Sequence, residues 1–430
     1  MGKTPRSSRT GTKQTTRALV MGLATVVIAA GCVACGGSDQ SSGGSQKANG
    51  DVTLTWSMWA SGTADRNAWQ KVADEVTADN PKIKVKLDTS PFADYFTKLG
   101  TRLAGGSAPC IVSMQSLRVG GYTDGMLPLG DLITKNKLDI GSFNKSIIDG
   151  LASGGKQYAL PYDFGSLVVT YNKDMFKAAG VPAPKVGWTM AEFEAAAKKL
   201  TRGGKYGFAA YPVDLYMFPM LLSRTGAEPV SGGGKLALTG KTMVSGFDWY
   251  TGLSAKDHVA PKVPGVDNAF PDTQFLNGNV AMSVNGPWSV LSLKTQAKFD
   301  VGLATIPAGP DGTKTYSAGS GFGISKSCKY PDQAFQAIKT MTSAKVLGEL
   351  GALGRAFPAR TAVQDQWYKN AFPGAQEVID AANKSATPFK TTKNWDQVTK
   401  LLSQYGVQAF NGQESGASVL QQVQQQAGTG

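Results

Sequence analysis

Few side chains of this sequence offer the usual chemistry of catalysis or metal binding. His258 is its only histidine, so a site built from several imidazoles, as in zinc or non-haem iron enzymes, cannot form. A serine–histidine–carboxylate triad would depend on this one residue, which lies in a predicted loop. The four cysteines, at positions 32, 35, 110 and 328, lack the spacing of a metal cluster. We therefore predict neither a metal nor a cofactor.

The composition is that of a globular, moderately basic protein. The chain has 430 residues, a length that suits two or three domains. Of these residues 41% are hydrophobic and 17% are charged, as in a globular protein. The net charge is +13, and it falls to +8 without the five cations that precede the first acidic residue, Asp39 (Lys3, Arg6, Arg9, Lys13 and Arg17). No block of five or six like charges follows, so we expect no nucleic-acid partner.

The first fifty residues indicate export. Residues 1–17 are basic and free of acids, and 18–30 (ALVMGLATVVIAA) are largely apolar. This apolar run is shorter than the roughly 20 residues of a membrane-spanning helix and fits the core of an export signal. Small residues, Ala29, Ala30 and Gly31, lead directly into Cys32. This arrangement resembles the lipobox of bacterial lipoproteins, whose cysteine is acylated and becomes the new N-terminus.

We therefore predict a lipoprotein signal peptide over 1–31, lipidation at Cys32 and a flexible, glycine- and serine-rich tether over 32–50. Cys35 is the alternative lipidation site, because the Gly-Gly-Ser after it is also typical of a lipoprotein start. Cys32 is preferred, since lipidation of Cys35 would put a cysteine where the pattern has an aliphatic residue. A plain secretory signal with incidental cysteines is the remaining alternative.

Segments with strand and helix patterns alternate after residue 51. The patterns predict strands over 52–56, 83–87 and 111–114 and helices over 64–78 and 92–103. This alternation predicts a mainly parallel sheet with helices on its faces, in a doubly wound α/β lobe. A similar series follows, with predicted strands over 167–171, 206–210, 280–284 and 321–325 and a helix over 331–341. Thr189 and Glu192 predict a capping box at the start of another helix.

Several segments between residue 52 and the last helix are similar to one family. They are 160–162 (LPY), 171–176 (YNKDMF), 275–282 (FLNGNVAM), 285–288 (NGPW) and 321–325 (GFGIS). In this order and behind a lipobox, they resemble the extracellular sugar-binding proteins of bacterial ATP-driven importers, the group that includes the maltodextrin binders. The resemblance covers essentially the whole mature chain.

This resemblance implies a two-lobe α/β fold of the periplasmic-binding-protein type (type 2), with the ligand cleft between the lobes. The N-terminal lobe would hold 51–160 and 318–357, and the C-terminal lobe 161–317 and 358–430. The family topology also places the strand at 321–325 antiparallel beside the strand that starts after Pro109. Cys110 and Cys328 would then be neighbours, so we expect a disulfide between them. Two free thiols are the alternative, which export to an oxidising compartment disfavours.

The resemblance also indicates ligand-binding residues. Trp288, in the NGPW motif, matches the tryptophan that stacks on a sugar ring in maltodextrin binders, and Trp395 resembles the family's second aromatic plate. Asp163 lies near the place of a hydroxyl-binding carboxylate. Sugars present apolar faces and hydroxyl edges, which suit aromatic, charged and amide side chains. The positions at strand ends and in loops add Trp59, Gln115, Ser116, Arg355, Tyr211 and Tyr216.

Each of these residues has a structural alternative. A tryptophan is often a core residue, an aspartate in a turn often binds backbone N–H groups, and an arginine in a loop is often solvated. Trp59 and Trp395 are equally consistent with packing at the start or end of an element.

The function that the resemblance implies is that of a non-enzymatic receptor, which closes on a sugar and delivers it to the permease of an ABC importer. The expected partners are the sugar, the permease subunits and a lipid anchor on the extracellular face of the cell membrane, and the expected state is a monomer. One alternative keeps the fold but binds a polyamine, metal chelate, peptide or anion. Another is an exported glycoside hydrolase, which would need two carboxylates flanking the sugar bond. The tryptophans favour a sugar, whereas the net charge of +8 gives some support to an anion.

Overall fold

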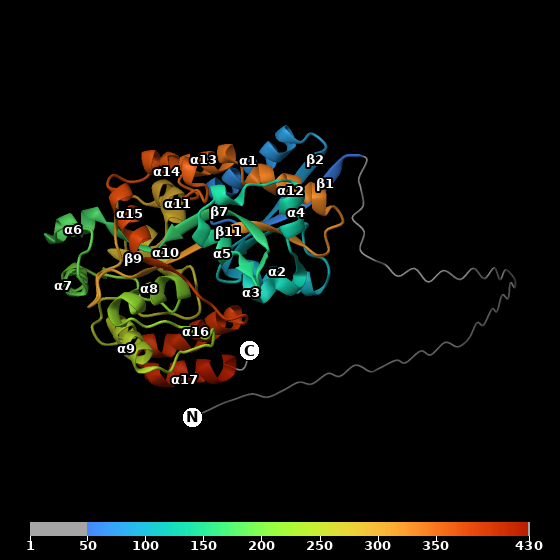
Figure 1. Ribbon diagram of the computed structural model, residues 1–430. Coiled ribbons are helices and arrows are strands. Elements are labelled where there is room, and N and C mark those ends of the chain that lie inside the picture. Colours follow the sequence, from blue (N-terminus) through green and yellow to red (C-terminus); the bar gives the residue numbers. More distant parts are fainter. Residues whose placement is uncertain (1–49, 429–430) are drawn as a thin grey trace, which may run out of the picture. The chain divides into compact units, whose positions relative to one another are not determined.

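The structure, a computed structural model, describes residues 50–428 (Figure 1). The predicted signal peptide, most of the tether and the candidate lipidation sites Cys32 and Cys35 lie outside the described residues. Two large hydrophobic cores organise this part of the chain, and we call the regions around them the first and second lobes. Within 50–428, no helix has the length and apolar character needed to cross a membrane.

The first lobe is built on a seven-stranded sheet. Its main path is β12-β11-β3-β1-β2, and β4 and β7 also pair with β11. The strands are β1 (Val52–Trp59), β2 (Ile83–Ser90), β3 (Ile111–Gln115), β4 (Met126–Leu127), β7 (Ala159–Ser166), β11 (Thr315–Ser325) and β12 (Ala386–Pro388). β1 is parallel to β2 and β3, as the alternation of strands and helices predicts, whereas β11 runs antiparallel to β3.

Alternation of side chains decides which face of β1 is buried. Val52, Leu54 and Trp56 are buried, whereas the threonines between them are exposed. Helix α1 supplies apolar residues at helical spacing to the same core, among them Trp69 and Val76. The helices of this lobe are α1 (Thr63–Asp79), α2 (Phe92–Ala104), α3 (Val119–Tyr122), α4 (Gly130–Lys135), α5 (Lys145–Gly150), α12 (Pro331–Met341) and α13 (Ala344–Ala352), with a small hairpin of β5 (Ala152–Ser153) and β6 (Lys156–Gln157).

The second lobe contains a three-stranded antiparallel sheet of order β10-β8-β9. The strands are β8 (Val168–Asn172), β9 (Met282–Asn285) and β10 (Val301–Ala304). The predicted strand at 206–210 is wrong, because the N–H groups of Gly207 and Phe208 both donate to Val259 O in a loop and only an isolated bridge forms at Tyr206. The surrounding helices are α6 (Lys173–Ala179), α7 (Met190–Leu200), α8 (Asp214–Thr225), α9 (Lys241–Ala255), α10 (Phe270–Leu276), α11 (Val290–Gln296), α16 (Trp395–Phe410) and α17 (Gly416–Ala427). The predicted capping box of Thr189 and Glu192 is confirmed at the start of α7.

The chain passes between the two cores along β7 and β11. On β7, Tyr162 belongs to the first core and Leu167, just beyond the strand, to the second; on β11, Ala318 belongs to the second and Phe322 to the first. Helices α14 (Asp365–Asn370) and α15 (Ala375–Ser385) still contribute to the first core, which extends to Ala382. We predicted that all of 358–430 belongs to the second lobe. The chain instead reaches the second core for the last time only after β12, between Ala382 and Phe389.

A disulfide joins the two passes of the chain through the first lobe. Cys110 and Cys328 are bonded, with Cα atoms 4.5 Å apart, and this is the pair that the family topology brings together. The neighbouring backbone explains the proximity, because Ser325 N donates to Cys110 O at the end of the antiparallel pairing of β3 and β11.

Candidate functional site

The carboxyl ends of β1, β2 and β3 meet at one edge of the first sheet, because these strands are parallel. Trp59 ends β1, and Phe92 begins the helix after β2. The ring of Trp59 lies 5.6 Å from that of Phe92 and 5.8 Å from that of Phe96. Arg118, three residues after β3, places its guanidinium 4.8 Å from the centre of the Phe96 ring. We call Trp59, Phe92, Phe96, Arg118 and Tyr122 the first-lobe wall.

Charged groups of the second lobe meet this wall. Arg118 Nε lies 3.0 Å from Asp396 Oδ1, and its Nη1 lies 3.8 Å from Asp214 Oδ2. Tyr122 Oη donates a short hydrogen bond to the other oxygen of Asp396. Asp214 and Asp396 lie in the first turns of α8 and α16, where the helix dipole favours a carboxylate. Arg118 and Tyr122 therefore connect the two lobes (Figure 1 shows α3 near the start of α16).

A second group of polar and aromatic side chains lies within the second lobe. Tyr216 Oη donates to Asp272 Oδ2 and Asn285 Nδ2 donates to Asp272 Oδ1, each at 3.0 Å. Burial raises the pKa of Asp272 to about 6, although these two hydrogen bonds oppose the rise. Trp288 follows Asn285 in the NGPW motif and is half-buried against the second core. We call Tyr216, Asp272, Asn285 and Trp288 the second-lobe wall.

The glycine of the NGPW motif permits the position of Trp288. The indole folds back over Gly286, where a Cβ would overlap the ring. Pro287 begins a short 3-10 turn, η3 (Pro287–Ser289), and packs against Gly165 of β7. The motif thus fixes an indole at the end of β9, next to a strand that passes between the lobes.

Two of the aromatic residues predicted to bind a ligand are buried inside the second lobe. Trp395 is 1% exposed, and its Nε1 donates to Asp214 Oδ2 at 2.8 Å. Tyr211 is fully buried, and its Oη donates to Gly265 O at 2.6 Å. Burial raises the pKa of Tyr211. Neither ring has a free face in this arrangement, so the indole of Trp395 positions Asp214 and is not an open plate for a ligand.

Asp163 and Arg355 also differ from expectation. Arg355 is 5% exposed, pairs with Asp65 of α1 and lies 4.4 Å from the centre of the Trp69 ring. Asp163 is 3% exposed and accepts a 2.6 Å hydrogen bond from Ser320 N. Both side chains are enclosed by the first core and have internal partners. Arg355 is therefore not the exposed loop donor that we predicted, and Asp163 is not open to sugar hydroxyl groups as we predicted.

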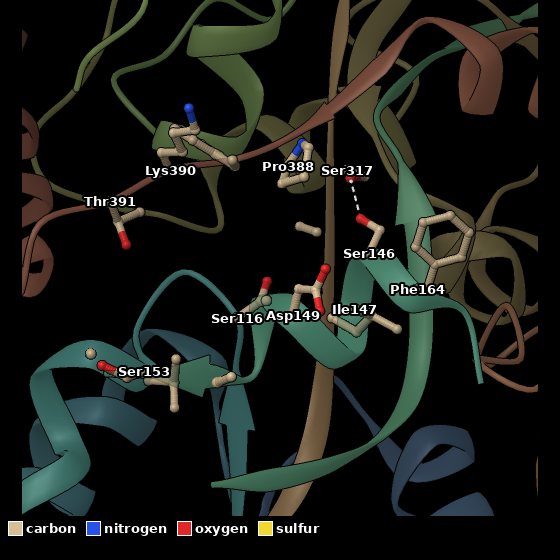
Figure 2. Close-up of a pocket in the computed structure, with 16 residues that line it drawn as sticks. Ser116, Ser146, Ile147, Asp149, Ser153, Phe164, Ser317, Pro388, Lys390 and Thr391 are labelled. Carbon is tan, nitrogen blue, oxygen red and sulfur yellow. Dashed lines mark hydrogen bonds between the residues drawn. The ribbon is translucent and has the colours of Figure 1, made fainter. Parts of the chain in front are cut away.

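Gln115 and Ser116 lie at the end of β3 but face different surroundings. Gln115 Oε1 accepts a hydrogen bond from Arg118 Nη1 at 3.2 Å and so supports the first-lobe wall. Ser116 lines a cavity of about 300 Å³ between the lobes, shown in Figure 2 with Ser146 and Asp149 on one side and Lys390 on the other. The lining of this cavity includes none of the three tryptophans predicted to bind a ligand.

Five residues of the candidate site are not among those predicted from the sequence: Arg118, Tyr122, Asp214, Asp396 and Asp272. A partial signal exists for three of them, because Arg118 closely follows a predicted strand, Asp396 follows Trp395, and Asp214 starts a helix after a loop. Their pairing across the lobes has no local signal, because the partners are far apart in the chain.

Comparison with known proteins shows the family to which this chain is similar. The family model described as bacterial extracellular solute-binding protein matches residues 59–347. A maltooligosaccharide ABC transporter solute-binding lipoprotein of Streptococcus pneumoniae is 29% identical over 342 residues, 75% of this chain and 71% of the relative. A diacetylchitobiose-binding protein of Streptomyces coelicolor is 27% identical over 374 residues, 82% of this chain and 84% of the relative.

Solved structures show the same fold. An ABC substrate-binding protein from Listeria monocytogenes, solved in complex with cycloalternan, superposes with a TM-score of 0.81 over 87% of this chain and 98% of its own, at 24% identity. This likeness confirms the predicted two-lobe α/β fold.

Proposed function

Because this chain belongs to the bacterial extracellular solute-binding protein family, we propose that it is the carbohydrate receptor of an ABC importer. The receptor binds an oligosaccharide between its lobes and presents the closed form to the permease. Two relatives, named as maltooligosaccharide- and diacetylchitobiose-binding proteins, support a sugar made of several units.

One observation carries the proposal: aromatic rings and a charged group of one lobe face carboxylates of the other at the carboxyl ends of the parallel strands β1, β2 and β3. Arg118 stands on the aromatic first-lobe wall and pairs with Asp214 and Asp396 of the second lobe. Sugar hydroxyl groups are donors and acceptors, so they can take the place of such pairs, while ring faces stack on aromatic side chains. A ligand that contacts both lobes shifts the population toward closure.

The proposed contact residues come from both walls. Trp288 and Tyr216 offer aromatic surface in the second lobe, and Trp59 does so in the first. Arg118 binds hydroxyl groups in place of its present partners. Trp395 positions Asp214 and Gln115 positions Arg118 rather than touching the sugar, whereas Tyr211 packs on Phe270 inside the second lobe.

The arrangement favours binding over hydrolysis. A glycosidase needs one protonated and one ionised carboxyl group on either side of the sugar bond. Asp214 and Asp396 instead share one arginine and also accept hydrogen bonds from Trp395 and Tyr122. Asp272 has a raised pKa, but both of its oxygens are bound by Tyr216 and Asn285. We therefore assign no catalytic residue.

We further propose that lipid on Cys32, or alternatively on Cys35, anchors the receptor at the extracellular face of the membrane. The lipobox-like sequence and the lipoprotein name of the S. pneumoniae relative support this. The chain then works as a tethered monomer beside its permease. A Cys32→Ala variant should leave the membrane fraction of the native host, whereas retention there would point to Cys35.

Calorimetric titration of residues 50–430, which contain both cores, tests the function. The panel includes maltooligosaccharides, diacetylchitobiose, mannobiose, a polyamine and inorganic phosphate, and each mixture is then analysed for hydrolysis products. We expect saturable binding of one sugar class, recovered unchanged. Binding of the polyamine or phosphate alone would favour a non-sugar receptor, and cleavage of a sugar would contradict the non-enzymatic assignment.

A further inference from the structure

A glycine of the first lobe lies against a backbone carbonyl of the second lobe. Gly121 belongs to α3, and a Cβ at this position would lie 2.5 Å from Lys393 O, a distance that real Cβ atoms essentially never show. The residue before it, Gly120, has more room, because its Cβ would lie 4.0 Å from Lys393 Cα, an ordinary van der Waals contact. At Gly121 the lobes therefore approach more closely than any side chain would allow.

Helix α3 is fixed to the first lobe. Arg118 N, just before the helix, donates to Gln115 O at the end of β3 at 3.0 Å. Val119 is 3% exposed and belongs to the first core. Gly121 N donates to Arg118 O at 3.0 Å, so the position of the glycine depends on that of Arg118. Gly121 therefore moves with the first lobe.

The carbonyl that it contacts is fixed to the second lobe. Lys393 lies between Phe389 and Trp395, which both belong to the second core. The next residue, Asn394, donates from Nδ2 to Ala427 O in α17 at 2.8 Å. Lys393 O is therefore carried by the second lobe, and its distance from α3 depends on how closely the two lobes approach.

Backbone conformation does not explain the glycine pair. Neither Gly120 nor Gly121 has a positive φ, and both lie in a helix, where alanine is more favourable than glycine. In the described part of the chain, apart from its own neighbours in sequence, only atoms of Lys393 lie within 4 Å of a Cβ at Gly121. The lack of a side chain at Gly121 therefore matters for the contact between the lobes and not for the helix.

The same helix makes the polar contacts between the lobes. Arg118 and Tyr122, on either side of the glycine pair, both bind Asp396 of the second lobe, and Arg118 Nε lies 3.0 Å from Asp396 Oδ1. A Cβ at Gly121 would have to move about 1 Å away from Lys393 O to reach an ordinary contact distance. The same shift would bring the Arg118–Asp396 distance to about 4 Å, the outer limit of an ion pair.

We propose that Gly121 is a positioning residue for lobe closure: by leaving room for Lys393 O, it lets the lobes come close enough for the polar contacts of α3 to form. The inference rests on the proposed function, because a receptor of this kind works by closing. A side chain at Gly121 stops the lobes about 1 Å short of the arrangement seen here, while each lobe keeps its own fold.

The test measures the distance between the lobes with spin labels. Thr97→Cys in α2 and Lys400→Cys in α16, both exposed positions, carry the labels in residues 50–430, with the Cys110–Cys328 disulfide intact. Distance distributions are recorded without sugar and with the tightest-binding sugar of the calorimetric panel. Urea unfolding of every variant shows whether its fold is retained.

The variant is Gly121→Ala, and the matched control is Gly120→Ala. Both make the same change in the same helix, but only the first puts a Cβ inside contact distance of Lys393. We expect a short-distance population in the wild type and in Gly120→Ala, and one at least about fivefold smaller in Gly121→Ala, as for overpacking of a close contact. The free energy of unfolding should not fall in either variant, because alanine favours a helix.

Three results would overturn the proposal. They are a short-distance population in Gly121→Ala equal to that of the wild type, equal losses in Gly121→Ala and Gly120→Ala, and no short-distance population in the wild type in either condition. The recordings without sugar separate this proposal from the proposed function. A wild type whose lobes close as expected but which binds no sugar of the panel would contradict the proposed function alone.

Discussion

Replacing Trp288 by alanine should raise the Kd for the sugar while the protein still folds. The indole is half-buried, with one side over Gly286, so a sugar ring can stack only on the remaining surface. If stacking covers roughly 60 Å² of apolar surface, its loss costs about 1.5 kcal/mol at ~25 cal/mol per Å². This corresponds to a rise of roughly tenfold in Kd. Calorimetric titration with the tightest sugar of the panel measures it.

Trp249 provides the matched control. It is also a half-buried tryptophan packed against the second core, but its Nε1 donates to Glu194 at 2.8 Å, away from both walls. Trp249→Ala should leave the Kd within about twofold of the wild type, a change of less than ~0.5 kcal/mol. Equal losses of affinity in the two variants, or an unchanged Kd in a folded Trp288→Ala, would refute the assignment of Trp288 as a sugar-stacking residue.

Three further predictions concern the lobes and their stability. Arg118→Met leaves Asp214 and Asp396 without their shared cation. It should raise the Kd for the sugar at least about tenfold, or ~1.4 kcal/mol, and increase the radius of gyration of the ligand-free protein in X-ray scattering. An unchanged Kd would contradict the role of Arg118. Denatured, unreduced protein of residues 50–430 should show no reactive thiol, and reduction should lower its free energy of unfolding by about 2–5 kcal/mol; reactive thiols before reduction would show that the disulfide does not form. Burial raises the pKa of Asp272 to about 6, so the stability that its protonated form contributes is lost as the pH rises through about 6. The free energy of urea unfolding should therefore fall less with rising pH, up to about pH 6, in Asp272→Asn than in the wild type. A fall as steep as in the wild type would mean that other groups cause it.

Much of the fold follows from local signals in the sequence. The alternation in β1, the spacing of buried residues in α1 and the capping box at Thr189 each depend on neighbours a few positions apart. The segment at 206–210 has the composition of a strand, but Gly207 and Phe208 donate to a loop carbonyl instead of a neighbouring strand. Tertiary context therefore overrides β-propensity there.

The candidate site was less predictable, because its partners are distant in the chain. The position of Trp288 follows from the Gly-Pro pair before it, which is visible in the sequence. Nothing local shows that Arg355 is buried, since its partner Asp65 lies 290 residues earlier. The same is true of Arg118, which would have seemed an ordinary loop cation without Asp396 beside it. Such pairs depend on how whole lobes pack.

A crystal structure of residues 50–430 with the tightest-binding sugar would show whether the ligand lies between the two walls. We predict that the sugar lies between the two walls, with a ring face on Trp288 and hydroxyl groups within hydrogen-bond distance of Arg118 and at least one of Asp214 and Asp396. A sugar bound in the cavity beside Ser116, or on one lobe alone with Arg118 still paired to both carboxylates, would contradict it.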